Sequence, residues 1–199
     1  RREPRVPGGM RALAIQRARL GDQAAVPALA GRLADAEPAV RLAALAALRR
    51  LGATRAAPEV RRLLGGDPVP AVRAAAAAVL ADLAGSAAIP DLAARRGDES
   101  PAVRLEAAGA LAGLGRPAAA SLTAFVADPR PDVRKTAVVA LGQFGGVEAL
   151  PAIAGVAADA GRANLGARVA AAEALGDIRR VEGIPILERL AADPEPSVR

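Results

Sequence analysis

The chain has 199 residues, and 52% of them are hydrophobic although only two are aromatic; 27 basic residues against 21 acidic ones give a net charge of +6. The lack of cysteine excludes a disulfide framework, a thiolate metal site and a cysteine nucleophile, and the lack of histidine removes the commonest general base and the usual zinc or iron ligand. Because the hydrophobic residues are mostly alanine, leucine and valine, without the alternation of aromatic and β-branched residues that favours strands, we expect an all-α protein.

The first residues, RREPRVPGGMRALAIQRARLGD, are basic and lack the apolar core of a signal peptide. No unbroken run of 18 or more apolar residues is found, so we expect no membrane insertion and a cytoplasmic location. The chain starts without methionine and stops at PEPSVR, which suggests that it is a piece of a longer protein.

A long helix is predicted in DAEPAVRLAALAALRRLG at residues 35–52, and similar stretches recur at 97–115 and 128–145. An anchor arginine aligns the copies, and the anchors are Arg41, Arg73, Arg104, Arg134, Arg168 and Arg199. Apolar residues recur one residue before each anchor and three, seven and ten residues after it, which is the spacing of one stripe of an α-helix. A proline three residues before every anchor except Arg168 indicates the first turn, and Gly52, Gly115 and Gly145 indicate left-handed helix ends.

A second, shorter helix is predicted between successive long ones, at VPAL (26–29), APEV (57–60), IPDL (89–92), LPAI (150–153) and IPIL (184–187). One repeat is then a helical hairpin of about 31 residues. Ordering it costs on the order of 45 kcal/mol of conformational free energy, at about 1.5 kcal/mol per residue. Two small alanine-rich faces cannot offset this cost unless neighbouring hairpins stack and bury them. We therefore predict a single right-handed α-solenoid of stacked antiparallel hairpins over residues 1–199. Its units lie near 8–34, 35–66, 67–97, 98–127, 128–158 and 159–192, with the start of another at 193–199.

The pattern D-x-x-x-x-V-R-x-x-A-x-x-A-L followed by I-P-x-L resembles HEAT repeats, specifically the HEAT-like repeats first associated with phycobilisome bilin lyases. The resemblance covers essentially the whole chain. It implies that the second helix of each hairpin lines a concave surface. It leaves function open, because the same repeat serves many unrelated partners.

An aspartate stands six residues before most anchor arginines, and we interpret these acid–arginine sets as a structural ladder between repeats. The carboxylate would bind helix-start or turn amides, and the guanidinium would bridge neighbouring repeats. The ladder comprises Asp35, Arg41, Asp67, Arg73, Asp98, Arg104, Asp128, Arg134, Arg168, Asp193 and Arg199. Before Arg168 the spacing from Asp159 is nine residues, and this longer loop could present Arg162 and Asn164 to a partner or only alter the local curvature.

Positions one, five and nine after each anchor form another row on the long helix, away from the buried stripe. The resemblance implies that this row faces the concave surface, where a partner would bind. It comprises Arg11, Ile15, Arg19, Leu42, Ala46, Arg50, Ala74, Ala78, Asp82, Leu105, Gly109, Gly113, Lys135, Val139, Gln143, Val169, Glu173 and Asp177. The row begins basic, passes through small residues and ends acidic, which suits an extended peptide or helix of opposite polarity, although undirected variation of surface residues would give a similar pattern.

Residues 1–62 carry 13 arginines against five acidic residues, so the positive charge of the chain belongs to its first third. This favours nucleic-acid binding as an alternative function, but tryptophan and tyrosine are absent and stacking platforms for bases are missing. A second alternative, a subunit of a bilin lyase-type enzyme, follows from the resemblance alone.

We identify no catalytic residue, metal site or cofactor. A HEAT-like metal hydroxylase would need paired His–Glu iron ligands, and Ser100 and Ser121 have no histidine to activate them. The sequence therefore predicts a non-catalytic scaffold that binds another protein or peptide along the concave row.

Overall fold

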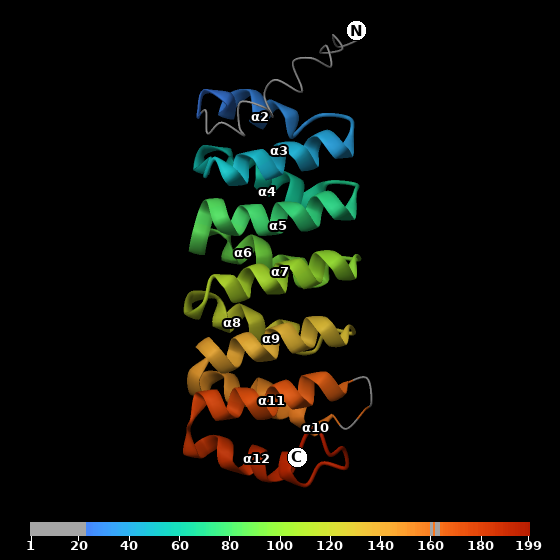
Figure 1. The fold of residues 1–199 in the computed structure, drawn as a ribbon, viewed down its shortest axis with the longest axis vertical. Coiled ribbons are helices and arrows are strands. Elements are labelled where there is room, and N and C mark those ends of the chain that lie inside the picture. The colour runs from blue at the N-terminus through green and yellow to red at the C-terminus, as the bar shows by residue number, and fades with distance from the viewer. Residues whose placement is uncertain (1–22, 160, 162–163) are drawn as a thin grey trace. The chain divides into compact units, whose positions relative to one another are not determined.

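The computed structural model describes residues 23–159, 161 and 164–199, and within these residues all regular secondary structure is helical (Figure 1). The long helices are α3 (Pro38–Arg50), α5 (Pro70–Ala84), α7 (Pro101–Gly113), α9 (Pro131–Phe144) and α11 (Leu165–Ile178). The short helices are α2 (Val26–Arg32), α4 (Ala57–Gly66), α6 (Ile89–Ala94), α8 (Ala119–Leu122), α10 (Leu150–Ala158) and α12 (Ile184–Ala191). Short 3-10 turns join many of them.

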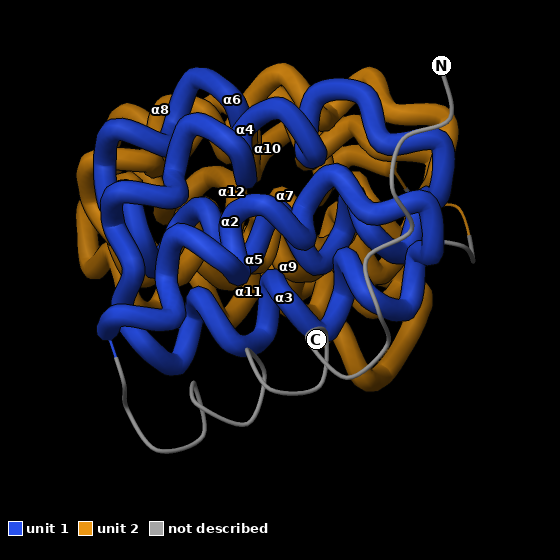
Figure 2. Tube along the Cα trace, turned by 90° about the horizontal axis from the view of Figure 1, so that it is seen from above, with its two compact units in different colours: residues 1–91 blue, residues 92–199 orange. Residues whose placement is uncertain are grey.

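The chain divides into two compact units, residues 1–91 and residues 92–199, and the boundary in the sequence falls within α6 (Figure 2). In the first unit α2 packs against α3, α4 packs against α5, and the long helices α3 and α5 contact each other. In the second unit α9 lies between α7 and α11, α8 and α10 pack against the long helices that follow them, and α12 contacts α10 and α11. Each unit is thus a stack of helical hairpins, and the predicted all-α solenoid class is confirmed.

The predicted apolar stripe forms the core of each unit. The alanines three residues after the anchors, from Ala44 to Ala171, are fully buried, as are most of the leucines seven residues after them. The positions ten residues after the anchor are less uniform, because Leu51 and Leu83 are buried whereas Phe144 and Ile178 are only half-buried. Alanine at the helix contacts lets neighbouring helices approach closely, so small residues carry much of the packing.

Proline at the start and glycine at the end of the long helices behave as predicted, with one exception among the glycines. Proline is the first residue of α3, α5, α7 and α9, where its missing N–H costs no hydrogen bond. Gly52 and Gly115 have positive φ angles of 57° and 70°. Gly145 was wrongly predicted to do the same: its φ is −78°, and Gly146, at 59°, takes the left-handed conformation. Gly145 instead makes a close approach, since a Cβ there would lie 2.7 Å from the carbonyl oxygen of Leu141.

The segment from Pro70 to Gly97 is long and apolar enough to cross a membrane by composition, with a mean hydropathy of 1.5 over its most apolar window. It is not one continuous helix, because α5 ends at Ala84 and is followed by Gly85, where φ is 55°. Half of that window is buried, including Val72, Ala76 and Leu80. The segment therefore has the burial of a core helix in a stacked repeat.

Candidate binding surface

The anchor arginines join one repeat to the next. In the first unit, Nη1 of Arg41 donates hydrogen bonds to the carbonyl oxygens of Asp35, at 2.8 Å, and Ala36, at 3.1 Å. The other side of the same guanidinium meets the carboxylate of Asp67 in the following repeat, with Nη2 donating to Oδ1 at 2.8 Å and Nε 2.7 Å from Oδ2. Arg41 and Asp67 are both buried, so this bidentate pair is shielded from water.

The second unit repeats this arrangement. Arg104 donates to the carbonyl oxygen of Asp98 and to both carboxylate oxygens of Asp128, and the hydrogen bond to Asp128 raises the pKa of Arg104 above its ordinary value. Nε of Arg168 lies 2.9 Å from Oδ2 of Asp193. The guanidiniums therefore bridge repeats through the acid of the next repeat, while they hold their own turn through its backbone carbonyl.

The aspartates also shape the turns that precede the long helices. Oδ1 of Asp67 accepts a hydrogen bond from the N–H of Val69 at 2.9 Å, and Asp128 accepts from the N–H of Arg130 at 2.8 Å. Such a bond to an amide two residues further on is an Asx turn, and it fixes the chain just before the helix begins. These carboxylates and guanidiniums thus form hydrogen bonds within the chain and stabilise the fold.

In the repeat with the longer loop, Asn164 replaces the aspartate. Its Oδ1 accepts a hydrogen bond from Nε of Arg134 at 2.8 Å, and its Nδ2 donates to the carbonyl oxygens of Val156 and Asp159. The side chain is 2% exposed, so the alternative in which Asn164 contacts a partner is wrong. Arg162 lies outside the described residues.

We call positions one, five and nine after the anchors the long-helix row. In the first unit its described members are Leu42, Ala46, Arg50, Ala74, Ala78 and Asp82, and in the second they are Leu105, Gly109, Gly113, Lys135, Val139, Gln143, Val169, Glu173 and Asp177; none of them is buried. The ninth positions are all exposed, whereas the first positions are half-buried except for the exposed Lys135. Arg11, Ile15 and Arg19 lie outside the described residues.

The row differs in charge between the two units. In the first unit Asp82 is occupied by an ion pair with Arg49, and Arg50 remains exposed with no ion pair among the described residues. In the second unit Glu173 and Asp177 are exposed, and neither forms an ion pair within the described part of the chain. A Cβ at Gly109 or Gly113 would meet no atom within 4 Å, so open space lies beside the middle of α7.

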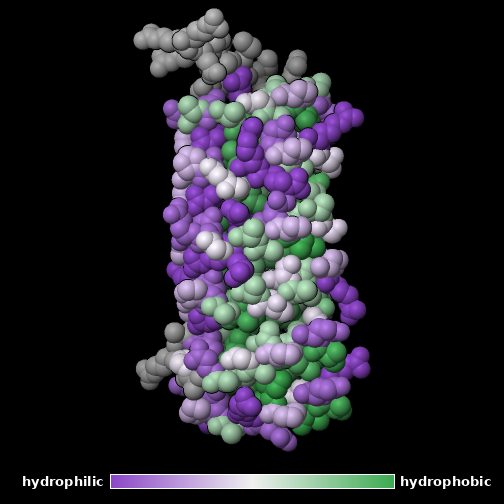
Figure 3. All heavy atoms as spheres, turned by 180° about the vertical axis from the view of Figure 1, so that it is seen from behind, coloured by the Kyte–Doolittle hydropathy of each residue, from purple (hydrophilic) through white to green (hydrophobic). Residues whose placement is uncertain are grey.

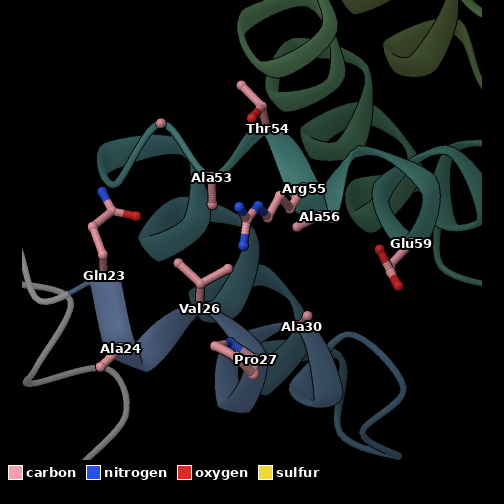
Figure 4. Close-up of a pocket in the computed structure, with 11 residues that line it drawn as sticks. Gln23, Ala24, Val26, Pro27, Ala30, Ala53, Thr54, Arg55, Ala56 and Glu59 are labelled. Atoms are coloured by element: carbon pink, nitrogen blue, oxygen red, sulfur yellow. The ribbon is translucent and has the colours of Figure 1, made fainter.

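A hollow of about 600 Å³ lies on the short-helix side of the first unit, and the sequence analysis did not predict it. It is lined by α2, by the turn after α3 and by the start of α4; Figure 4 shows Arg55 extending toward Val26. Its lining includes Arg55 and Glu59 but no member of the long-helix row. The only signal for it in the sequence is the run of small residues at 52–54 between a long and a short helix.

The described residues contain no group of three or more acidic, histidine or cysteine side chains placed to hold a metal ion. The acidic residues of the ladder accept bonds from arginines and turn amides.

Comparison with known proteins identifies the repeat. Models of HEAT repeats match residues 10–81, 26–98, 89–165 and 122–199. The chain belongs to the HEAT-repeat family. No curated protein gives a significant match to this HEAT-repeat chain.

Two solved structures are similar to this HEAT-repeat protein. Human deoxyhypusine hydroxylase, solved in complex with glycerol, is 26% identical over 96% of this chain and 75% of the hydroxylase, with a TM-score of 0.50. The complex of CpcE and CpcF of phycocyanin lyase from Nostoc sp. PCC7120 is 24% identical over 92% of this chain and 73% of that chain, with a TM-score of 0.45.

Proposed function

We propose that this HEAT-repeat protein is a non-catalytic scaffold that binds a partner protein or extended peptide through the long-helix row. One observation carries the proposal: every described member of the row is at least partly exposed, on helices whose apolar stripe is buried in the stack. A side chain that is required neither for the core nor for the ladder is free to contact a partner.

The charge of the row gives the partner a stated chemistry. The exposed Arg50 in the first unit suits an acidic contact. In the second unit the exposed Glu173 and Asp177 suit a basic contact, and the exposed Lys135 suits an acidic one. The half-buried Leu42, Leu105 and Val169 add apolar contacts beside the charges. Each unit thus offers the proposed partner its own combination of apolar and charged contacts.

A protein partner is favoured over nucleic acid by the surroundings of the arginines. Arg49 and Arg61 are paired with Asp82 and Asp91, which reduces the positive charge available to phosphates in the first unit. The aromatic side chains do not serve as base platforms either, because Phe125 is 1% exposed and Phe144 is half-buried.

Catalysis is disfavoured by composition. The fold is similar to that of deoxyhypusine hydroxylase, but this chain has no histidine to act as a metal ligand or general base. We therefore propose a binding role for the same type of stack.

Site-specific photocrosslinking tests the proposal. A benzophenone side chain placed at Ala46, Gly109 or Gln143 should crosslink to one protein partner in the native host, whereas the same group at the exposed short-helix positions Ala28 and Ala120 should not. Arg50→Glu should weaken capture at Ala46. Recovery of nucleic acid, or equal crosslinking from both sets of positions, would contradict the proposal.

A further inference from the structure

Glu59 and Asp91 occupy the same position in successive short helices of the first unit, directly after the proline of α4 and of α6. Their surroundings differ. Nε of Arg61 in α4 donates a hydrogen bond of 2.6 Å to Oδ2 of Asp91, so the acid of α6 is paired with the preceding short helix. The residue of α2 that corresponds to Arg61 is Ala30, three residues after the proline of its helix, and it offers Glu59 no cation.

Alanine at this position of α2 leaves Glu59 without a partner. The Oε2 atom of Glu59 is buried and accepts no hydrogen bond within the described part of the chain. Burying a carboxylate oxygen without a donor costs free energy, so such an atom in a folded protein requires an explanation. Ala30 and Glu59 both line the hollow of about 600 Å³ on the short-helix side of the first unit. A donor placed in this hollow would satisfy Glu59 as Arg61 satisfies Asp91.

The hollow is also lined by a cation without a partner. The side chain of Arg55 forms no ion pair or hydrogen bond with any residue that the structure describes. Arg55 and Glu59 are four residues apart on the helical stretch formed by η2 (Thr54–Ala56) and α4, a spacing at which opposite charges commonly pair. Figure 4 shows the Arg55 side chain pointing away from Glu59 and toward Val26. One cation and one anion thus line the same hollow without neutralising each other.

The rest of the lining is mainly apolar. The helix α2 contributes Val26, Pro27 and Ala30 to it. Nε2 of Gln23 donates a hydrogen bond of 2.8 Å to the carbonyl oxygen of Leu51, which holds the turn before α2 against the end of α3. In Figure 3, which shows the short-helix side, hydrophilic and hydrophobic side chains are interspersed over the first unit. A hollow of this volume, with a few polar groups in an apolar lining, is typical of a site for a small ligand.

We propose that this hollow binds a ligand with a guanidinium group and a carboxylate at opposite ends of an aliphatic chain, as in free arginine or a C-terminal arginine residue. The guanidinium binds Glu59 in the way that Arg61 binds Asp91, and the carboxylate binds the guanidinium of Arg55. Arg55 and Glu59 are about 6 Å apart along the helix axis, at about 1.5 Å per residue, so the ligand needs charges that are well separated. The hollow includes no member of the long-helix row, and the proposal does not depend on the function of that row.

NMR titration of the isotopically labelled chain with N-acetyl-L-arginine tests the proposal, because the guanidinium and the carboxylate are the only charges of this probe. Saturable shift changes should appear at the backbone amides of Ala30, Arg55 and Glu59. N-acetyl-L-citrulline, which has a neutral urea group in place of the guanidinium, should bind more weakly by about tenfold or more. N-acetyl-L-argininamide, which lacks the carboxylate, should be weakened to a similar degree. Equal dissociation constants for the three compounds, or no saturation by N-acetyl-L-arginine, overturn the proposal.

Substitutions connect the binding to the named side chains. Glu59→Gln and Arg55→Gln should each weaken the binding of N-acetyl-L-arginine by about tenfold or more. Arg62→Gln, at an exposed position of α4 that does not line the hollow, should leave the dissociation constant unchanged. Equal effects of all three substitutions overturn the proposal, since the probe would then respond to the net charge of the chain alone.

Ala30→Arg separates loss of the site from loss of the fold. The introduced guanidinium should pair with Glu59 as Arg61 pairs with Asp91, so binding should be lost while the urea midpoint stays the same or rises. Unchanged binding by this variant overturns the proposal. L-arginine and the tripeptide Ala-Ala-Arg present the same two groups, and the one that binds the original chain more tightly identifies the ligand as a free molecule or as the end of a peptide. Binding of neither overturns the proposal.

Discussion

Nε of Arg134 donates a hydrogen bond of 2.8 Å to Oδ1 of Asn164, where other repeats place an aspartate carboxylate. The amide of Asn164 also donates to the carbonyl oxygens of Val156 and Asp159. A carboxylate accepts hydrogen bonds but does not donate them, so only an amide side chain satisfies both the guanidinium and these carbonyls at once. Asn164 thus ties the longer loop into the ladder together with Arg168, whose Nη1 donates to the carbonyl oxygens of Asp159 and Gly161.

Substitution of Asn164 should therefore destabilise the second unit. We expect Asn164→Ala to lower the free energy of unfolding by about 1–3 kcal/mol, because it leaves buried donors and acceptors without partners. Asn164→Asp should restore the contact to Arg134 but not those to the two carbonyls, and its stability should lie between that of the alanine variant and the original chain. Urea denaturation measures both, and an alanine variant as stable as the original chain would show that the contacts are dispensable.

The ladder and the surface ion pairs should respond differently to truncation. The side chains of Arg41 and Asp67 are 8% and 2% exposed, so Asp67→Ala should cost about 3–5 kcal/mol by leaving a buried guanidinium unpaired. Asp82, whose side chain and that of its partner Arg49 are about half exposed, is the matched control. Asp82→Ala should cost less than about 1 kcal/mol. Equal losses of unfolding free energy for the two variants would contradict the ladder's structural role.

Gly142 should tolerate no side chain. A Cβ at this position of α9 would lie 2.5 Å from the Cβ and 2.6 Å from the Cα of Ala174 in α11, so Gly142→Ala should force the helices apart and cost about 1–3 kcal/mol. Gly176 of α11 is the control, because a Cβ there meets nothing within 4 Å. Gly176→Ala should instead raise stability by up to about 1 kcal/mol through helix propensity. The melting temperature and the urea midpoint should both fall for Gly142→Ala and both rise for Gly176→Ala.

The carboxyl of Asp132 should titrate below its ordinary range. The hydrogen bond from Arg130 is the main cause that lowers the pKa of Asp132, and the bond from the N–H of Val133 acts in the same direction. Since the pKa is lower in the folded chain than in the unfolded chain, the pair contributes stability above the unfolded pKa and loses it as the pH falls through the folded pKa. Carboxyl NMR titration should show a higher pKa for Asp132 in Arg130→Gln, and an unchanged value would assign the shift to other groups.

The repeat pattern predicted the core well because burial on a helix depends on spacing alone. Ala44, Ala76 and their counterparts are buried wherever the anchor places them, and proline is the first residue of α3, α5, α7 and α9. The long-helix row was predictable from the same spacing, because positions one, five and nine after the anchor lie away from the buried stripe of the helix.

Features that depend on the path of a loop were not predictable in this way. The role of Asn164 arises because the inserted residues bring its amide back to Val156 and Asp159, which no periodicity encodes. The left-handed residue after α9 moved from Gly145 to Gly146 because Gly145 lies against Leu141 and Ala149. The hollow beside Arg55 likewise requires two turns from different repeats to lie side by side.

The contact between Gly142 and Ala174 has a consequence for recognition. Because the absent side chain at Gly142 lets α9 and α11 pack closely against each other at Ala174, the close contact opposes relative displacement of the helices that carry Lys135, Val139 and Gln143 and Val169, Glu173 and Asp177. The partner that we propose would meet a preorganised surface at these six positions, and the protein would forfeit little conformational entropy on association. Selectivity at this pair of helices would then come from shape that is set before the encounter rather than from adjustment after it.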